Sequence, residues 1–104
     1  MDETKQQIIY ENNIYILRYM GGDVNSNGIV IKDGKDMPFP TTGYHANGFL
    51  LYDDDWNWLM PVLNIILNLE IVQENIKLYY QIIDGIPDIK KTYEKIVEFI
   101  KENK

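Results

Sequence analysis

The order of apolar and polar side chains along the chain predicts both helices and short strands. In "NNIYILRYMGG" apolar residues recur at helical spacing, and Gly21-Gly22 suits the left-handed conformation that commonly ends a helix. We therefore expect a first short helix that starts at Asn12 or Asn13. The same stretch also alternates between apolar and polar positions over residues 14–18, which leaves a strand as the alternative.

Two short apolar runs predict a small sheet. Ile29–Ile31 lies between glycines, and Phe49–Tyr52 follows an irregular stretch with two prolines, "KDMPFPTTGYHANG". We expect the two runs to pair with each other across this long connection. Loops of this length in a compact domain often carry binding contacts, so the connection itself is a candidate site.

The most apolar segment, "YDDDWNWLMPVLNIILNLE", predicts the central helix of the core. Its apolar positions share one wide face, and asparagines occupy a narrow opposite stripe. Asp53–Asp55 stand where the helix begins, where a carboxylate can accept a hydrogen bond from a free backbone N–H and favours the positive end of the helix dipole. Because Pro61 has no N–H to donate, we expect a capped turn over residues 54–60 that kinks into a main helix over residues 61–68.

The second half of the chain predicts one strand and one helix. Apolar side chains alternate with others over residues 76–82, a period of two that favours a strand. A helix is the second choice, so Ile71–Ile83 stays open between the two. The last stretch, "IPDIKKTYEKIVEFIKENK", has a clear helical apolar stripe, with Pro87 suited to the first turn and Asp88 to the positive end.

Length and composition complete the fold prediction. A chain of 104 residues that is 45% hydrophobic has enough apolar side chains for one core. The pattern predicts one α+β domain over residues 1–104, in which about three helices pack on a small, mainly antiparallel sheet of three or so strands.

The charge balance bears on the kind of partner. Sixteen acidic and ten basic residues give a net charge of −6, which disfavours direct binding to phosphate backbones. An acidic surface either serves solubility alone or meets a basic groove on a protein partner. The absence of cysteine is compatible with a reducing cytoplasm. The longest apolar stretch, Trp58–Leu69, is shorter than the roughly 20 residues that cross a bilayer, so no membrane partner is expected.

Catalytic chemistry has few candidate residues. His45 is the only histidine, and Ser26 has no nucleophile-elbow context. Asp53–Asp55 could bind a cation through oxygen ligands, but the spacing of an EF-hand loop is absent, and a helix-start role is favoured. The sequence therefore predicts a protein that is not an enzyme, with no catalytic residue, cofactor or metal ion.

Acidic and aromatic residues outside the core helices are the remaining candidates for function. Aromatic side chains that cannot all be buried are natural anchors for a protein partner, although each taken singly can also be explained by packing over the sheet. We place Tyr79 on the exposed face of the strand expected over residues 76–82. The predicted partner-binding residues are Asp23, Asp33, Asp36, Phe39, Tyr44 and Tyr79.

Three stretches resemble one group of known proteins. "DDDWNWLMPVLNII" resembles a W-D-W-L-M-P-V-V segment of small uncharacterised proteins from phages and mobile elements of Bacteroidetes bacteria. "YEKIVEFIKENK" is similar to their closing Y-K-A-V-V-E-F-I-K helix, and "YILRYMGG" to their opening I-A-E-F-M-G-G. The three stretches cover about two fifths of the chain, and the W-x-W-L-M-P-V core is the specific one. This chain has Asn57 where that pattern usually has Asp.

The resemblance implies a context rather than an activity. It suggests a small phage-type accessory protein in the cytoplasm of a host bacterium, and such proteins often bind and block host machinery. The leading hypothesis is a non-enzymatic inhibitor that occludes a basic nucleic-acid channel of a host defence protein, such as a CRISPR-type nuclease. The alternative is a structural or self-associating module, for instance a homodimer, whose acidic surface serves only solubility.

Overall fold

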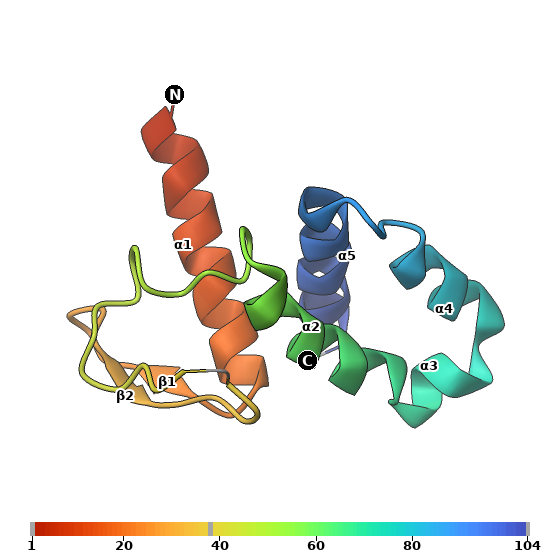
Figure 1. Ribbon diagram of the computed structural model, residues 1–104, viewed down its shortest axis with the longest axis horizontal. Helices are drawn as coiled ribbons and strands as arrows, with labels where there is room; N and C mark the ends of the chain where they lie inside the picture. The colour runs from red at the N-terminus through yellow and green to blue at the C-terminus, as the bar shows by residue number, and fades with distance from the viewer. Residues whose placement is uncertain (1, 38, 104) are drawn as a thin grey trace.

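Five helices and a two-stranded antiparallel sheet form the part of the chain that the computed structural model describes, residues 2–37 and 39–103 (Figure 1). In chain order the elements are α1 (Asp2–Tyr19), β1 (Asp23–Val24), β2 (Val30–Lys32), α2 (Trp56–Leu67), α3 (Glu70–Glu74), α4 (Ile76–Ile83) and α5 (Ile89–Glu102). The α+β class is confirmed. The expectation of about three helices and a larger sheet was too coarse.

The elements are arranged along the long axis of the molecule. Figure 1 shows the hairpin and the loop that follows it at one end, α3 and α4 at the other, and α1, α2 and α5 between them. α5 contacts α1, α2 and α4, which makes it the helix around which the core assembles. No helix within residues 2–37 and 39–103 combines the length and the apolar character needed to span a bilayer.

The first helix is longer than the sequence predicted, and the strand alternative is wrong. α1 begins at Asp2 and ends at Tyr19, where Gly21 takes a positive φ of 94° and Gly22 donates to the carbonyl of Leu17. Only the second half of α1 buries a continuous apolar face, with Ile16 and Leu17 fully buried. The first half lacks that signal because most of its side chains face solvent.

The small sheet pairs neighbours in the chain rather than the two predicted runs. β1 pairs with β2 in the register Asp23 to Lys32 and Val24 to Val30, so the expected strand at Ile29–Ile31 is displaced by one residue. The predicted pairing with Phe49–Tyr52 is wrong, because that run forms turns with Leu50 and Tyr52 buried. A two-residue strand has no alternation for a sequence pattern to detect, and a tight turn brings it to β2 without a long loop closure.

The central helix starts as predicted but is not divided. Asp55 caps α2 by accepting a hydrogen bond from the backbone N–H of Asn57 at 2.8 Å. The helix then runs through Pro61 to Leu67 as one element, so the predicted division into a turn over residues 54–60 and a main helix over residues 61–68 is wrong. The carbonyl that proline leaves without a helical donor belongs to Asn57, which is exposed, so water can satisfy it.

The segment at residues 76–82 is helical, so the predicted strand is wrong and the second choice is right. Asn75 caps α4 by accepting from the N–H of Leu78 at 3.1 Å. Leu78 and Ile82, one turn apart, face the core beside α5, and this packing outweighs the strand preference of the alternating pattern. α5 begins at Ile89, after Asp88, which caps it by accepting from the N–H groups of Lys90 and Lys91. Pro87 therefore precedes the helix, and its predicted place in the first turn is wrong.

Candidate protein-binding surface

An aromatic cluster joins the loop after β2 to the first turn of α2. We define it as Phe39, Tyr44, Phe49, Tyr52 and Trp58. The indole of Trp58 lies at its centre, with ring centroids 5.5 Å from Tyr52 and 6.4 Å from Phe49, both edge to face, and 6.2 Å from Phe39. Tyr44 stacks on Phe49 at 4.2 Å with nearly parallel rings. These contacts fix the ring positions of an otherwise irregular loop.

Two members of the aromatic cluster are open to solvent. Phe39 is 53% exposed and Tyr44 is 54% exposed, whereas Trp58 and Tyr52 are buried. An aromatic side chain that is held by buried neighbours loses little conformational freedom when a partner covers it, which is the property of an interface anchor. Both rings are among the predicted partner-binding residues, and their role in binding stays a prediction. Their supports, the half-buried Phe49 and the buried Trp58, were not predicted as part of the site.

Asp33 holds the loop that carries Tyr44. One carboxylate oxygen, Oδ1, accepts hydrogen bonds from the backbone N–H and hydroxyl of Thr41, at 2.6 and 2.8 Å, and of Thr42, at 2.7 and 2.9 Å. These donors, the Thr41 N–H first, lower the pKa of Asp33 below its usual value although the residue is exposed. Asp33 therefore has a structural role that the sequence did not indicate.

Replacing Asp33 by alanine should destabilise the fold by about 1–2 kcal/mol, because four donors lose a charged acceptor in a partly solvated setting. The measurement is urea unfolding followed by circular dichroism. Because the pKa of Asp33 is lower in the folded state than the unfolded value of 3.8, the ionised carboxylate stabilises the folded state at pH values above 3.8. The difference in free energy of unfolding between wild type and D33A should therefore shrink as the pH falls below about 4. Asp36→Asn is the control, and its free energy of unfolding should stay within about 0.5 kcal/mol of wild type. An equal loss of stability in both variants would contradict the structural role of Asp33.

The other two predicted aspartates are exposed but differ in their surroundings. Asp23 accepts a hydrogen bond from the N–H of Val24 at 2.8 Å and forms an ion pair with Arg18 at 3.1 Å, and these contacts, the Val24 N–H first, lower the pKa of Asp23. Asp36 has a positive φ of 56° and lies at the rim of a shallow hollow with Pro61 and Asn64 of α2. Asp36 thus faces solvent beside α2, the helix that carries Trp58. Part of the charge of Asp23, in contrast, is neutralised by Arg18 of the same chain.

The net negative charge of the protein is concentrated in the same part of the chain, because few basic residues accompany the acidic ones there. Six of the sixteen acidic residues lie between Met20 and Asp55, and only Lys32 and Lys35 among the ten basic residues accompany them. This segment therefore carries −4 of the net charge of −6, while the remainder is close to neutral. Acidic residues and exposed aromatics occur together in one segment, which we call the acidic loop segment, Met20–Asp55.

Tyr79 does not belong to this surface. It lies on α4, half-buried against the core and edge-on to Tyr80, with ring centroids 5.9 Å apart. The predicted exposed strand face on which it was placed does not exist. Figure 1 shows α4 at the opposite end of the molecule from the hairpin and its loop, so Tyr79 cannot act together with Phe39 and Tyr44 at one contact.

A buried polar network ties the acidic loop segment to two helices. Asn13 of α1 donates through Nδ2 to the carbonyl of Leu50 and to Oδ1 of Asp53, both at 3.1 Å. The hydroxyl of Tyr93 on α5 donates to Oδ1 of Asn13 at 2.9 Å. Burial, and then the nearby charge of Asp53, raise the pKa of the Tyr93 hydroxyl. These hydrogen bonds hold the end of the acidic loop segment, at Leu50 and Asp53, against α1 and α5.

Alkaline pH should destabilise the protein above about pH 10. Burial raises the pKa of Tyr52 and Tyr93 above the ordinary value of 10.0, so the folded state keeps protons that the unfolded state releases. The stabilisation is complete below pH 10 and is lost as the pH rises further. Urea midpoints measured from pH 7 upward should stay level and then fall, and the fall should be weaker in Tyr93→Phe. An unchanged pH slope in that variant would contradict the assignment.

The single histidine has a local structural role. Its Nδ1 accepts from the N–H of Asn47 at 3.0 Å, and its ring stacks with Tyr10 at 6.1 Å between centroids. Among residues 2–37 and 39–103, histidine, aspartate and glutamate side chains do not form a group of three that could hold a metal ion. Asp55 serves as the helix cap, and Asp53 belongs to the buried network.

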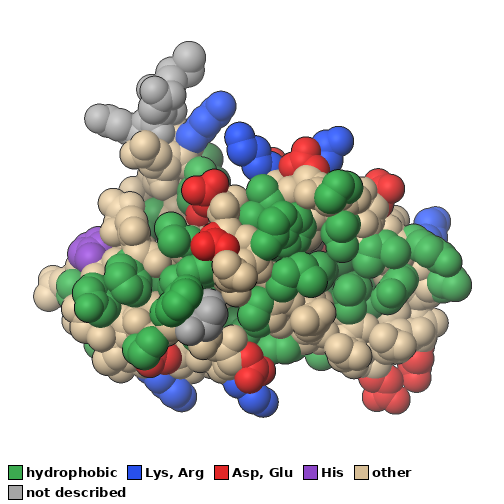
Figure 2. Space-filling model, viewed as in Figure 1, with side chains coloured by type: hydrophobic (Ala, Val, Ile, Leu, Met, Phe, Trp, Pro, Cys, Tyr) green, Lys and Arg blue, Asp and Glu red, His purple; other side chains and the backbone are tan. Residues whose placement is uncertain are grey.

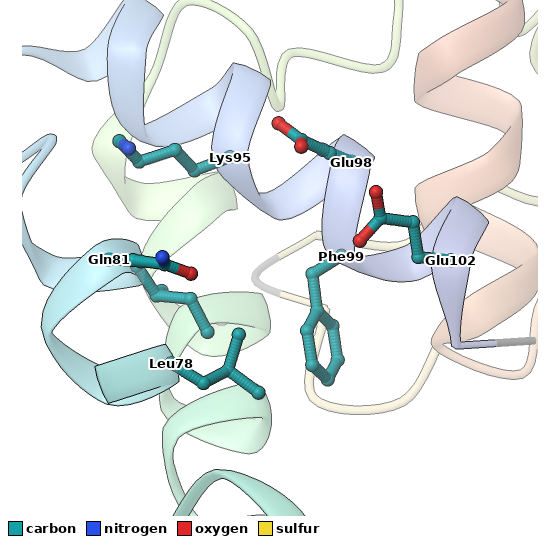
Figure 3. A pocket seen from close by; sticks show the side chains of 7 residues that line it. Leu78, Gln81, Lys95, Glu98, Phe99 and Glu102 are labelled. Carbon is teal, nitrogen blue, oxygen red and sulfur yellow. The ribbon is translucent and has the colours of Figure 1, made fainter. Parts of the chain in front are cut away.

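Two hollows lie beside α5, one of them at the end of the acidic loop segment. One, of about 310 Å³, runs between α4 and α5, and Figure 3 shows Leu78 and Phe99 on its floor with Glu98 and Glu102 along one side. The other, of about 390 Å³, lies between α1 and α5 beside Asp53. In Figure 2 hydrophobic side chains extend across one face from the loop end to α3 and α4, so apolar surface is a general feature of this face.

Comparison of the chain with protein-family models, with curated proteins and with solved structures finds no match.

Proposed function

We propose that the protein acts by binding another protein, without catalysis of its own, through the surface that Phe39 and Tyr44 form within the acidic loop segment. The observation that carries the proposal is that two exposed rings, held by Trp58 and Phe49, lie in the part of the chain that carries −4 of the net charge of −6. Aromatic anchors supply contact energy, and surrounding charges select the partner and speed the encounter.

The partner that fits this surface has a basic patch beside an apolar pocket. An acidic surface of this kind competes with nucleic acid for a basic channel, because both present negative charge to the same groups. Asp36 and Asp54 are the exposed carboxylates of the segment that are open to such a patch, whereas Asp33 and Asp23 are engaged within the chain. In the phage context that the sequence suggests, we propose that the partner is a host defence nuclease of the CRISPR type.

The test uses matched double variants as bait in a nuclease-treated lysate of a Bacteroidetes host. Phe39→Ala/Tyr44→Ala should lose the proteins that the wild-type chain captures. Ile8→Ala/Ile71→Ala, which removes side chains of similar exposure on α1 and α3, should retain them. Captured proteins should elute as salt is raised, since electrostatic contacts are screened. Equal capture by both double variants would refute the assigned surface.

The inhibitor hypothesis has its own direct test. A purified host CRISPR effector is mixed with the protein at stoichiometric ratio, and the binding of its target DNA is followed by gel shift. Wild-type protein should suppress DNA binding, and Phe39→Ala/Tyr44→Ala should do so at least tenfold less well, as expected for loss of two anchors. The alternative function, a structural module whose acidic surface serves solubility, predicts that neither variant changes any binding.

A further inference from the structure

The outward face of α4 carries an apolar stripe. Inward, α4 packs through Leu78, which lines the groove beside Phe99 of α5 (Figure 3). Outward, Ile76 and Tyr80 lie one turn apart and are 67% and 59% exposed, the highest values among the large hydrophobic side chains of the described residues. Ile83 extends the stripe by a further turn and is half-buried. Spacing of four and three residues places all three on one helix face.

Two opposite charges flank this stripe on the same side. Lys77 and Asp84 are both exposed and are seven residues apart, which is about two helical turns. Asp84 follows α4 with helical backbone angles, φ −60° and ψ −22°, so the helical spacing extends to it. Within residues 2–37 and 39–103 the one ion pair joins Arg18 to Asp23, so Lys77 and Asp84 do not neutralise each other or another charge within the chain.

An antiparallel arrangement makes this face complementary to itself. In an antiparallel helix pair with two-fold symmetry, equivalent flanks face each other and the start of one helix meets the end of the other. A two-fold axis near Tyr80 brings Ile76 beside Ile83 of the second copy. The same axis brings Lys77 beside Asp84 of the second copy, and the contact occurs twice. A parallel pair would instead place the two charged flanks on opposite sides of the contact, where they do not meet.

We propose that the protein forms a two-fold symmetric dimer in which the outward faces of two α4 helices pack antiparallel. The stripe is narrow, so the interface belongs to the small, weak class, with a dissociation constant on the order of 10–100 µM. The molecule extends 40 Å along its longest axis, and α4 lies at the end opposite the aromatic cluster (Figure 1). The dimer therefore leaves Phe39 and Tyr44 free on both copies and presents two partner-binding surfaces.

Sedimentation equilibrium over a wide concentration range, with a charge-swap series, tests this dimer. Lys77→Glu and Asp84→Lys should each weaken association about tenfold, because each places like charges together at two points. The double variant K77E/D84K restores opposite charges and should return to within about threefold of wild type. Tyr80→Glu should abolish association. Lys90→Glu, at an exposed position of α5, changes the net charge by the same amount as Lys77→Glu. It is the control and should leave the association unchanged.

Circular dichroism spectra of all variants should match that of wild type, since the substituted side chains are exposed. A wild-type chain that stays monomeric at the highest concentration would overturn the proposal. So would a dimer that survives Tyr80→Glu, or a double variant no better than the single ones. The dimer is independent of partner binding: Phe39→Ala/Tyr44→Ala should still dimerise, and loss of the dimer in that variant would place the interface on the aromatic cluster instead.

Discussion

Trp58→Ala should lower the free energy of unfolding by about 3–5 kcal/mol, the cost typical of removing a large buried aromatic side chain. Trp58 is 3% exposed and touches three other rings of the aromatic cluster, so the substitution leaves a cavity between α2 and the loop. A domain of this size has a total stability of about 5–15 kcal/mol, so the variant should retain little reserve. Urea unfolding followed by far-ultraviolet circular dichroism measures the change.

The control for this substitution lies two residues away on the same helix. Met60 is 40% exposed, and Met60→Ala should change stability by less than about 1 kcal/mol. Trp58→Phe, which keeps an aromatic ring in the site, should recover a large part of the loss. If Met60→Ala cost as much as Trp58→Ala, the segment would not be organised around the buried indole. The same comparison applied to partner binding should show Trp58→Phe close to wild type, because the supports of Phe39 and Phe49 are kept.

Asn13→Ala should be the second most damaging substitution, with a loss of about 2–4 kcal/mol. The side chain is 4% exposed and bridges α1, the loop and α5 through three hydrogen bonds. Its removal leaves the carbonyl of Leu50 without this donor, and leaves the hydroxyl of Tyr93 with only its longer contact to the carbonyl of Ile9, at 3.3 Å. Thermal and urea unfolding measure the loss. Tyr93→Phe removes one hydroxyl only and should cost about 1 kcal/mol.

A double-mutant cycle separates the network from simple packing. Asn13→Ala and Tyr93→Phe share one hydrogen bond, so their combined effect should be smaller than the sum of the single effects. Asn12→Ala, at the neighbouring position that faces the groove between α1 and α5, is the matched control and should stay within about 0.5 kcal/mol. Additive losses for the pair would show that the two side chains act independently.

The start of α2 was predictable because capping is local. Asp55 and Asp88 accept from N–H groups two and three residues ahead, so the sequence around them contains the whole interaction. The same is true of the glycine stop after α1. The apolar stripe of α5 was equally visible, since its period survives in any helical environment.

The candidate site also has features that the sequence could predict and features that it could not. Phe39 and Tyr44 were named as candidates from their place in a loop with prolines and glycines, but the sequence left open whether each ring packs or faces solvent; in the structure both are exposed. Their support by Trp58 and Phe49 did not follow, because those contacts join residues up to 19 positions apart whose approach depends on the folded loop. The role of Asp33 was hidden for the same reason, since its donors Thr41 and Thr42 are eight and nine residues away.

The sequence by itself determined the α+β class, the aspartate cap that starts α2, the glycine stop of α1 and the negative net charge, because these depend on composition and on neighbours within a few residues. Only the tertiary structure decided that residues 76–83 are helical, that β2 pairs with β1, and that Tyr79 lies apart from the other predicted residues. The physical reason is packing. Burial of Leu78 and Ile82 against the core around α5 stabilises the helix more than the local preference stabilises a strand, and this burial is possible only in the folded structure that contains α5.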